Sequence, residues 1–288
     1  MPRKPRVALV CPSDEASIYV VERCLTNHLA SFTLIDHTPC NATLASLMGL
    51  HPGEAEFIET SDADEAAALG VELVRNHRAD VLMKGIINTD NLMRAVLNKE
   101  RGLLIPGTVL SHIAMAQAPA YGKLLMFSDA TVIPVPTLPQ FEAMITYDVA
   151  LAQALGIAEP KVALIHFTEK TNPRFPVTTD YAELRRKCAE GVFGNAIVDG
   201  PMDVKTAVDA HSSAVKGIHS PVCGDADILI MPDLEAANTF YKTLSCFAGA
   251  TIAGMISGAT SPVVLPSRAD SPESKFYSLA LACVSVAR

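Results

Sequence analysis

The chain has 288 residues, and 49% of them are apolar, so it is long enough to bury one large core or two smaller ones. Its 23 Lys and Arg against 31 Asp and Glu give a net charge of −8, without long runs of one sign. This excludes nucleic acid as the expected partner, because a phosphate backbone needs a concentrated basic face, but a local cationic site can still bind one small anion.

The cysteines and the amino terminus do not predict export or membrane insertion. The seven cysteines form no C-x-x-C pair and most lie in apolar segments, which favours reduced core residues. The first residues lead into a strand-like segment without a signal-peptide apolar block, and no apolar run reaches about 18 residues. We therefore expect a cytoplasmic protein with no membrane partner.

Short β-rich segments alternate with helical segments along the chain. Residues 7–11 form the first predicted strand, a helix with apolar residues three or four apart begins at Asp14, and residues 32–35 form the next strand. Further strands are predicted at residues 80–83, 124–127, 162–165, 196–198, 228–231 and 263–265. This alternation predicts an α/β fold of parallel sheets covered by helices.

Two segments have the composition of domain joints. Residues 134–139 are proline-rich and lead into a helical stretch, and residues 254–262 are rich in Gly, Ser, Ala, Thr and Pro. They predict two α/β domains: residues 1–136 plus 259–288, and an inserted domain of residues 137–258. The expected place for a site is a cleft between the two domains.

Polar residues follow the predicted strand at residues 80–83. In α/β proteins such residues meet the N–H groups of a following helix, so strand ends are the first places to look for chemistry. Lys84, Asn88 and Thr89 occupy this turn, and Arg94 lies off the apolar stripe of the next helix. They are candidates for binding an anion, and an ordinary solvated side chain is the alternative for Arg94.

Two further junctions lie in the second half of the chain. Asp199, Gly200 and Pro201 follow a strand and predict a turn, in which glycine permits backbone conformations closed to other residues. Glu235 and Asn238 lie on the first turn of the helix after strand 228–231, off its buried stripe. Turn formation and helix capping are the structural alternatives to substrate binding.

The last junction follows the strand at residues 263–265. Ser267 and Arg268 end this strand, and Ser271 with Pro272 marks the start of a helix. A serine hydroxyl and the fixed donor fork of arginine can together bind a phosphate or a developing oxyanion. A helix cap with a surface salt bridge is the alternative.

Several common motifs are missing from the sequence. The eight histidines show no H-x-x-x-H or H-E-x-x-H spacing, so we expect no metal site. The phosphate loop of nucleotide hydrolases, the G-x-G-x-x-G fingerprint and the G-x-S-x-G elbow are absent too. Nucleotide hydrolysis, dinucleotide binding and serine hydrolysis therefore have no support.

Seven segments, in order, resemble the phosphate acetyl/butyryltransferase family, and more closely its butyryl branch. They are MKGIINTDNLMRAVLNKE, LSHIAM, FSDATV, EKTNPRFPVTTD, DGPMDV, ADILIMPDLEAAN and SRADS, and they span about residue 80 to the end. The resemblance implies an isocitrate dehydrogenase-like architecture of two α/β domains with the site in their cleft, a homodimer, no metal and no permanently bound cofactor. The implied reaction is acyl-CoA plus phosphate giving acyl phosphate plus coenzyme A, by direct transfer in a ternary complex.

The resemblance also implies roles for single residues. Ser267 would hydrogen-bond the sulfur or the carbonyl, Arg268 would stabilise the developing charge, and Arg94 matches a phosphate-binding arginine. In the acetyl branch a carboxylate on the last helix acts as base towards the coenzyme A thiol, but its ungapped counterpart here is Ser274. The base is therefore open between Asp270 and Glu273, for which helix capping is an equal alternative.

Three other functions are alternatives for a chain of this kind. An acyltransferase that uses acyl-carrier protein should carry a basic docking surface, and a dehydrogenase of the same architecture needs a nicotinamide site and a carboxylate cluster for a metal. A non-catalytic ligand-binding regulator of the same fold would bind acyl-CoA without turning it over. The net acidic chain shows no sign of the first two, and an activity assay distinguishes the third.

Overall fold

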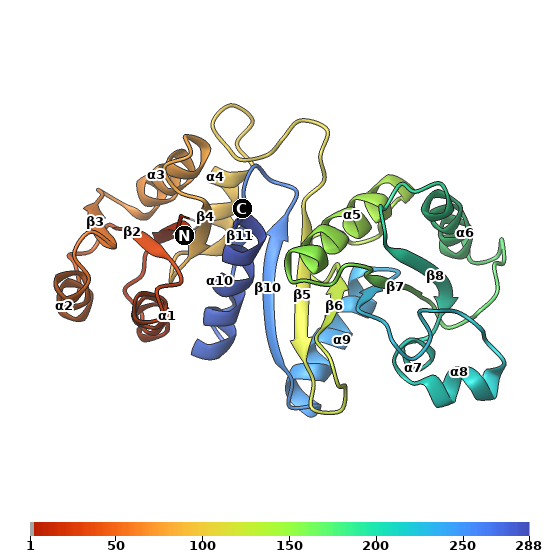
Figure 1. Ribbon diagram of the computed structural model, residues 1–288. Helices are drawn as coiled ribbons and strands as arrows, with labels where there is room; N and C mark the ends of the chain where they lie inside the picture. The colour runs from red at the N-terminus through yellow and green to blue at the C-terminus, as the bar shows by residue number, and fades with distance from the viewer. Residues whose placement is uncertain (1–2, 288) are drawn as a thin grey trace. The chain divides into compact units, whose positions relative to one another are not determined.

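The computed structural model describes residues 3–287, which form two compact units (Figure 1). Unit 1 combines the chain up to Leu110 with the chain from Ala253 onward, and unit 2 is Ser111–Ile252. The second unit thus begins earlier than the predicted boundary at residue 137. The reason is that β5 (Ser111–Gln117) pairs with β6 (Leu125–Ser128), which in turn pairs with a later strand of unit 2.

The sheet of unit 1 has the strand order β3-β2-β1-β4-β11-β10. Its strands are β1 (Arg6–Val10), β2 (Ser31–Asp36), β3 (Ala55–Glu59), β4 (Val81–Lys84), β10 (Thr251–Ser257) and β11 (Val263–Val264). All neighbouring pairs from β3 to β11 are parallel, and β10 runs antiparallel to β11. Polar residues after β1, β2, β4 and β11 therefore share one edge of the sheet.

Helices cover both faces of this sheet. They are α1 (Glu15–Thr26), α2 (Ala42–Leu50), α3 (Ala63–Arg75), α4 (Thr89–Val96) and α10 (Pro272–Val286). Figure 1 shows α3 beside α4 on one face and α1 beside α10 on the other. The inner strands β1, β2, β4 and β11 are mostly buried, as expected for parallel strands with helices on both sides, whereas the edge strand β3 is not.

Unit 2 repeats this architecture with the strand order β5-β6-β9-β7-β8. Its remaining strands are β7 (Lys161–Ile165), β8 (Ile197–Met202) and β9 (Ile228–Ile230), and its helices are α5 (Leu138–Ala154), α6 (Pro176–Ala189), α7 (Val204–Val208), α8 (Ala210–Lys216) and α9 (Leu234–Phe247). Its core includes Phe127, whose ring packs edge-to-face against Phe240 at 5.1 Å between centroids. Apart from β5, which is antiparallel to β6, the strands are parallel.

The α/β prediction is confirmed, and every predicted strand is present. The strands β3, β5 and β10 were missed, and β10 runs through the first half of the segment predicted as a joint at residues 254–262. That segment contains many small residues, but Met255 and Ile256 are buried, so it belongs to a sheet. The prolines at residues 134–139 instead start α5, where Thr137 and Gln140 form a capping box with Pro139 in the first turn.

The cysteines differ in their exposure to solvent. All seven cysteines of the described chain are free, but Cys246 is exposed, so its prediction as a core residue is wrong. Within residues 3–287, no helix is long and apolar enough to cross a membrane.

Candidate functional site

The polar residues after β4 and β11 form one group in unit 1, which we call the strand-end cluster: Lys84, Asn88, Ser267, Arg268 and Asp270. The two strands are parallel neighbours with Val264 opposite Met83, so their loops leave the same edge of the sheet. The Arg268 Nη2 donates to Asn88 Oδ1 at 2.6 Å, across 180 residues of sequence. The first and last predicted junctions therefore meet in space.

Lys84, the last residue of β4, is a buried cation at the base of this cluster. Its side chain is 3% exposed, and its Nζ donates to the carbonyl oxygens of Gly85 and Ile87, each at 3.1 Å. Burial lowers the pKa of Lys84, and the positive charges of Arg268 and Lys275 lower it further, against an opposite influence from Asp14 and Asp270. The side chains of Lys84, Arg268 and Lys275 are thus close enough to repel one another. Their combined positive charge favours binding of an anionic ligand.

Gly85 allows the turn after β4 to press against the end of β1. Its N–H donates to the Val10 carbonyl at 2.8 Å, and a Cβ at this position would lie 2.1 Å from the carbonyl oxygen of Cys11. Any side chain here would displace the backbone. Only glycine therefore fits after Lys84, and its conformation sets the direction in which the backbone continues towards Asn88.

Asn88 precedes α4 in the N-cap position, but its side chain makes no capping hydrogen bond. Its carbonyl oxygen accepts from Arg268 instead. The N–H groups in the first turn of α4, which starts with the exposed Thr89, are therefore left without a side-chain cap. Such an uncapped helix start favours an anion, since its N–H groups and its dipole both attract negative charge.

The loop after β11 presents Ser267 and Arg268 on a tight turn. Asp270 Oδ2 accepts from the backbone N–H of Ser267 at 2.7 Å, and the N–H of Asp270 donates back to the Ser267 carbonyl at 3.2 Å. Ser271 then caps α10, as predicted, by accepting from the N–H of Ser274. The backbone fixes both side chains in exposed positions, and Asp270 is one of the groups that hold the turn.

The two candidate bases lie in different environments. Asp270 is half-buried within the turn just described, whereas Glu273 is exposed on the first turn of α10. The Glu273 carboxylate accepts from the Tyr19 hydroxyl on α1 at 3.3 Å. Asp270 therefore lies beside the strand-end cluster, and Glu273 contacts the neighbouring helix.

Arg94 lies further along α4 than the other predicted anion ligands. It is six residues beyond Asn88, about 9 Å along the helix axis, and its side chain is 71% exposed. Its guanidinium forms an ion pair with Asp64 of α3 at 3.9 Å. The structure thus places Arg94 on the same helix as Asn88 and Thr89 but gives it a surface partner outside the strand-end cluster.

In unit 2 the predicted turn at residues 199–201 is wrong, because these residues lie inside β8. The requirement for glycine is nevertheless real: Gly200 has φ +147°, and a Cβ there would lie 2.6 Å from the Leu164 carbonyl oxygen. Asp199 accepts from Gly200 N–H at 2.8 Å and pairs with Arg185 Nε at 2.7 Å. These three residues therefore form part of an irregular strand, in which the Asp199 carboxylate already has an ion-pair partner.

Glu235 and Asn238 lie on α9, and neither is its cap. Asp233 occupies the N-cap position and accepts from the N–H of Ala236. The Asn238 amide donates to the carbonyl of Ala130 at 3.1 Å, which ties α9 to the loop after β6, and Glu235 is exposed. β7 lies between β8 and β9, so the two predicted groups of unit 2 belong to strands that are not neighbours.

Sequence reasoning missed two sets of buried ionisable side chains. Lys275 of α10 is 8% exposed and lies 3.7 Å from Asp14, the cap of α1, so it adds to the cationic surplus near Lys84. It could have been found, because it falls on the apolar stripe with Leu279 and Ala282. Such a lysine on a buried stripe signals a site or an ion pair.

The second missed group is a pair of carboxyl groups at the end of β6. Asp129 accepts three backbone N–H groups, from His112, Thr131 and Val132, at 2.8 to 2.9 Å. Asp148 of α5 is fully buried and accepts from the Ser128 hydroxyl at 3.0 Å. Burial raises the pKa of Asp148 well above its ordinary value, and the charge of Asp129 acts in the same direction.

The fold and the strand-end cluster together define a class of protein. It is an α/β protein in which positive charge and helix N–H groups lie at the carboxyl edge of a parallel sheet. Such a site is typical of enzymes that act on anionic substrates.

Comparisons with known proteins define the family. Residues 54–283 match the family described as "Phosphate acetyl/butaryl transferase". A probable phosphate butyryltransferase of Bacillus subtilis is 37% identical over 97% of this chain and 93% of its own length. A phosphate acetyltransferase of Thermotoga maritima is 42% identical over 77% of this chain and 75% of its own length.

A solved structure agrees with these relatives. A branched-chain phosphotransacylase from Enterococcus faecalis V583 has a TM-score of 0.83 and 31% identity, over 98% of this chain and 99% of that one. The chain belongs to the phosphate acetyl/butyryl transferase family and is a phosphotransacylase. The fold class and the kind of enzyme predicted from the sequence are confirmed.

Proposed function

We propose that this chain transfers a short acyl group of butyryl or branched-chain size between coenzyme A and inorganic phosphate, with the strand-end cluster of unit 1 as the centre of the chemistry. The observation that carries this proposal is the hydrogen bond between Arg268 and Asn88 at 2.6 Å. It joins the two junctions that match the family, and it places a guanidinium beside an uncapped helix start.

Phosphate binds, in this proposal, at the first turn of α4. The free N–H groups of this turn and the hydroxyl of Thr89 supply donors, and the charges of Arg268 and the buried Lys84 attract the anion. Arg94 is exposed and its ion pair with Asp64 is a surface pair, which costs about 1 kcal/mol or less to break. Its long side chain can therefore leave Asp64 and add a second guanidinium to the bound phosphate.

The acyl carbonyl then lies between phosphate and Arg268. Attack by a phosphate oxygen on the thioester carbon places negative charge on the carbonyl oxygen, and the donors of Arg268 that Asn88 does not use stabilise it. The exposed Ser267 hydroxyl donates to the carbonyl oxygen or to the leaving sulfur. Holding the attacking phosphate oxygen about 3 to 3.5 Å from the thioester carbon also lowers the barrier, since it removes the entropic cost of the encounter.

In the reverse direction a base takes the proton of the coenzyme A thiol, and we assign Asp270 to this role. Asp270 lies in the same turn as Ser267, and its charge raises the pKa of Lys84, whereas Glu273 accepts a hydrogen bond from Tyr19.

The remaining predicted substrate contacts stay predictions: Asp199, Gly200, Pro201, Glu235 and Asn238. We further propose a homodimer, a cytoplasmic location and no permanently bound cofactor; sedimentation equilibrium of the purified chain tests the first of these.

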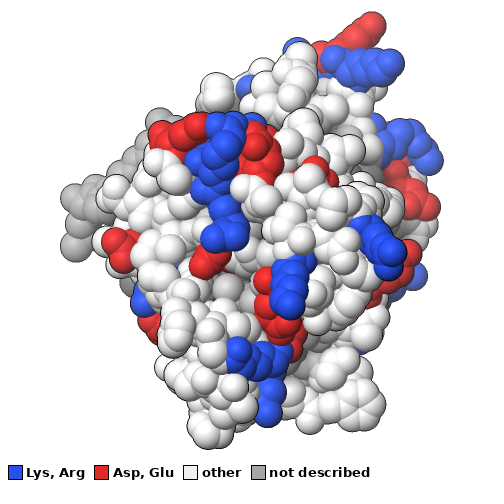
Figure 2. Space-filling view, turned by 90° about the vertical axis from the view of Figure 1, so that its right-hand side faces the viewer, with Lys and Arg blue, Asp and Glu red and all other residues white. Residues whose placement is uncertain are grey.

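Coenzyme A is favoured over a carrier protein as the acyl donor because a carrier protein is acidic and docks on basic surfaces. Figure 2 shows one face of the molecule, on which Lys and Arg side chains lie beside Asp and Glu. In unit 2, Lys187 pairs with Glu142, and Lys216 pairs with both Glu169 and Asp203. Positive charges neutralised in this way do not form a docking field.

The decisive experiment is a kinetic panel of acetyl-, propionyl-, butyryl- and isobutyryl-CoA, each with and without phosphate. We expect release of coenzyme A that requires phosphate, with the largest kcat/KM for a four-carbon acyl group. Preference for acetyl-CoA would overturn the proposed chain length but not the reaction. Binding of acyl-CoA without turnover would overturn the reaction.

A further inference from the structure

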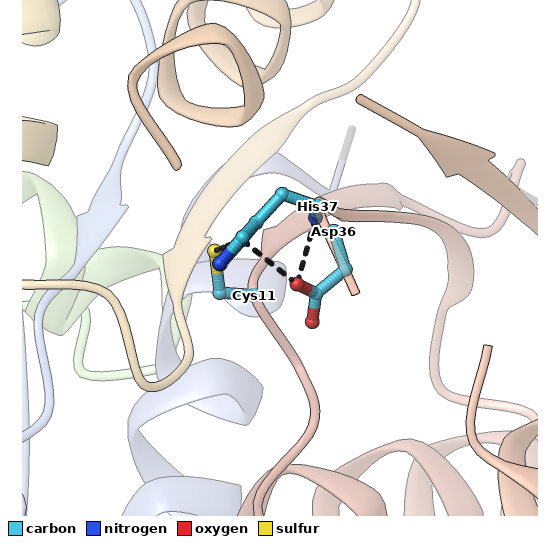
Figure 3. A group of neighbouring side chains, drawn as sticks. All are labelled: Cys11, Asp36 and His37. Atoms are coloured by element: carbon cyan, nitrogen blue, oxygen red, sulfur yellow. Dashed lines mark hydrogen bonds and ion pairs between the residues drawn. The ribbon is translucent and has the colours of Figure 1, made fainter. Parts of the chain in front are cut away.

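Three potential metal ligands meet at the edge of the unit 1 sheet that also carries the strand-end cluster. Cys11 follows β1, and Asp36 and His37 lie at the end of β2 (Figure 3). The two strands are parallel with Val10 opposite Ile35, so Cys11 comes directly opposite Asp36. The arrangement is a property of the sheet register.

The distances between the ligand atoms suit a single ion. Cys11 Sγ lies 3.9 Å from His37 Nδ1, which lies 3.2 Å from Asp36 Oδ1, and all three atoms are within 4.8 Å of one another. A tetrahedral zinc ion, with bonds of about 2.3 Å to sulfur and about 2.0 Å to nitrogen and oxygen, separates its ligands by roughly 3.3 to 3.6 Å. The two measured separations differ from these values by a few tenths of an ångström, and the third, between Cys11 and Asp36, would close by about 1.3 Å at most.

The ligands are also held in place. Asp36 is 2% exposed, and its Oδ1 accepts from the backbone N–H groups of His37 and Thr38 at 2.8 and 3.1 Å. Cys11 is 1% exposed, and its N–H donates to the Ile35 carbonyl at 2.7 Å. Only His37 reaches solvent, with 39% of its side chain exposed, so an ion can enter from one side and keep a water there.

The chemistry of the three groups favours a divalent metal ion. A carboxylate oxygen, an imidazole nitrogen and a thiol sulfur converge on one position, and binding of the ion would displace the thiol proton. The sulfur and imidazole ligands select zinc over magnesium or calcium, which prefer oxygen.

We propose that Cys11, Asp36 and His37 form a zinc-binding site at the carboxyl edge of the unit 1 sheet, with solvent as the fourth ligand. The thiol proton of Cys11 leaves to solvent when the ion binds, and no electron is transferred. The sequence predicts no metal site, because the ligands follow two different strands and include a single histidine, so no pair of histidines at ligand spacing marks them. The site is separate from the acyl-transfer chemistry, which uses no metal in our proposal.

The test uses the full chain after treatment with a chelator, titrated with zinc chloride against a chromophoric competitor and, separately, with cobalt chloride. We expect one zinc per chain, a thiolate-to-cobalt absorption band, and a higher melting temperature with zinc. His37→Gln should weaken zinc binding at least about 10-fold, the smallest effect typical even of outer partners of a metal, and Cys11→Ser should abolish the cobalt band.

Matched controls separate this site from adventitious binding. Cys40→Ser, Cys246→Ser and His51→Gln remove the same groups outside the cluster and should leave zinc affinity and the cobalt band unchanged. His37 is partly exposed, so His37→Gln keeps the test valid even if the buried Cys11→Ser variant does not fold. Unchanged affinity in His37→Gln, or loss of binding in Cys40→Ser, would overturn the assignment.

Discussion

The two units place polar residues at equivalent strand ends but use them differently. In unit 1 the charged groups act on one another across separate loops: Arg268 binds Asn88, and burial together with the charges of Arg268 and Lys275 lowers the pKa of Lys84. In unit 2 two of the predicted groups have partners close by, since Asp199 pairs with Arg185 and Asn238 binds a backbone carbonyl. The first arrangement leaves unbalanced charge for a ligand, and the second mainly fixes the backbone.

This difference teaches that strand-end position alone does not identify a reactive group. What distinguishes unit 1 is a surplus of cations beside a helix start without a side-chain cap. A buried lysine with a lowered pKa is costly for folding, which makes it a candidate for function. By contrast, the buried carboxyl groups of unit 2, Asp129 and Asp148, are bound by backbone and hydroxyl donors of their own unit.

Substitution of Arg268 tests the difference between the two units most directly. Arg268→Lys keeps the charge but loses the planar set of donors. We expect the activation free energy to rise by about 2 to 4 kcal/mol, so that kcat falls roughly 30- to 1000-fold, with the fold unchanged. Steady-state kinetics with butyryl-CoA and phosphate measures this. Arg186→Lys, at a surface ion pair of unit 2, is the control and should stay within twofold. Activity of Arg268→Lys within twofold of wild type would exclude a role in charge stabilisation.

Asn88 tests whether the contact between the two loops matters. Asn88→Ala removes the acceptor that orients Arg268, and we expect kcat to fall about tenfold, corresponding to about 1.4 kcal/mol. Asn88→Asp keeps an acceptor but adds a negative charge at the proposed phosphate site. It should therefore recover part of kcat while raising the KM for phosphate. Equal kinetics in the two variants would show that Asn88 neither orients Arg268 nor borders the phosphate.

The fold and half of the candidate site follow from the sequence for identifiable reasons. Strand positions were predictable because buried parallel strands form short apolar runs. The meeting of Asn88 and Arg268 was not predictable, because it depends on β4 and β11 being neighbours in the sheet. The strand β10 was not predictable from composition, because its small residues resemble a linker and strand pairing, such as that with β11, defines it.

Where the sequence misled, neighbours in space made the difference. The Gly-Pro pair at residues 200–201 is typical of a turn, but β8 is the last strand in the order of unit 2, and an edge strand tolerates proline and irregular register. Cys11 and Asp36 are 25 positions apart in the sequence, and only the register of β1 with β2 brings them together. Sequence spacing contains no record of such a pairing.

Arg94 sharpens the comparison within unit 1, because it is the predicted anion ligand with a partner outside the cluster. For Arg94→Ala we expect the KM for phosphate to rise about fivefold, about 1 kcal/mol, with little change in the KM for acyl-CoA. Asp64→Ala is the matched control, since it removes the same ion pair but leaves the arginine free to bind phosphate. Equal changes in both KM values, or the same effect in Asp64→Ala, would assign Arg94 to structure.

The smallest effect on turnover is expected for Asp148, where the change should appear in stability. Its pKa is raised by burial, so above the ordinary aspartate pKa of about 3.9 the unfolded chain loses a proton that the folded chain keeps. Stability contributed by this group is therefore complete below about pH 4 and declines as the pH rises towards its raised pKa. Asp148→Asn removes the ionisation but keeps an acceptor for Ser128.

We accordingly expect Asp148→Asn to gain stability relative to wild type as the pH rises from 5 to 8, with kcat unchanged. Guanidinium unfolding at several pH values measures the difference, and Asp90→Asn, at an exposed site on α4, serves as the control without such a trend. A pH-independent difference would mean that Asp148 is ionised in the folded protein. A large loss of kcat would mean that unit 2 also holds a catalytic carboxyl group, and the contrast between the two units would then fail.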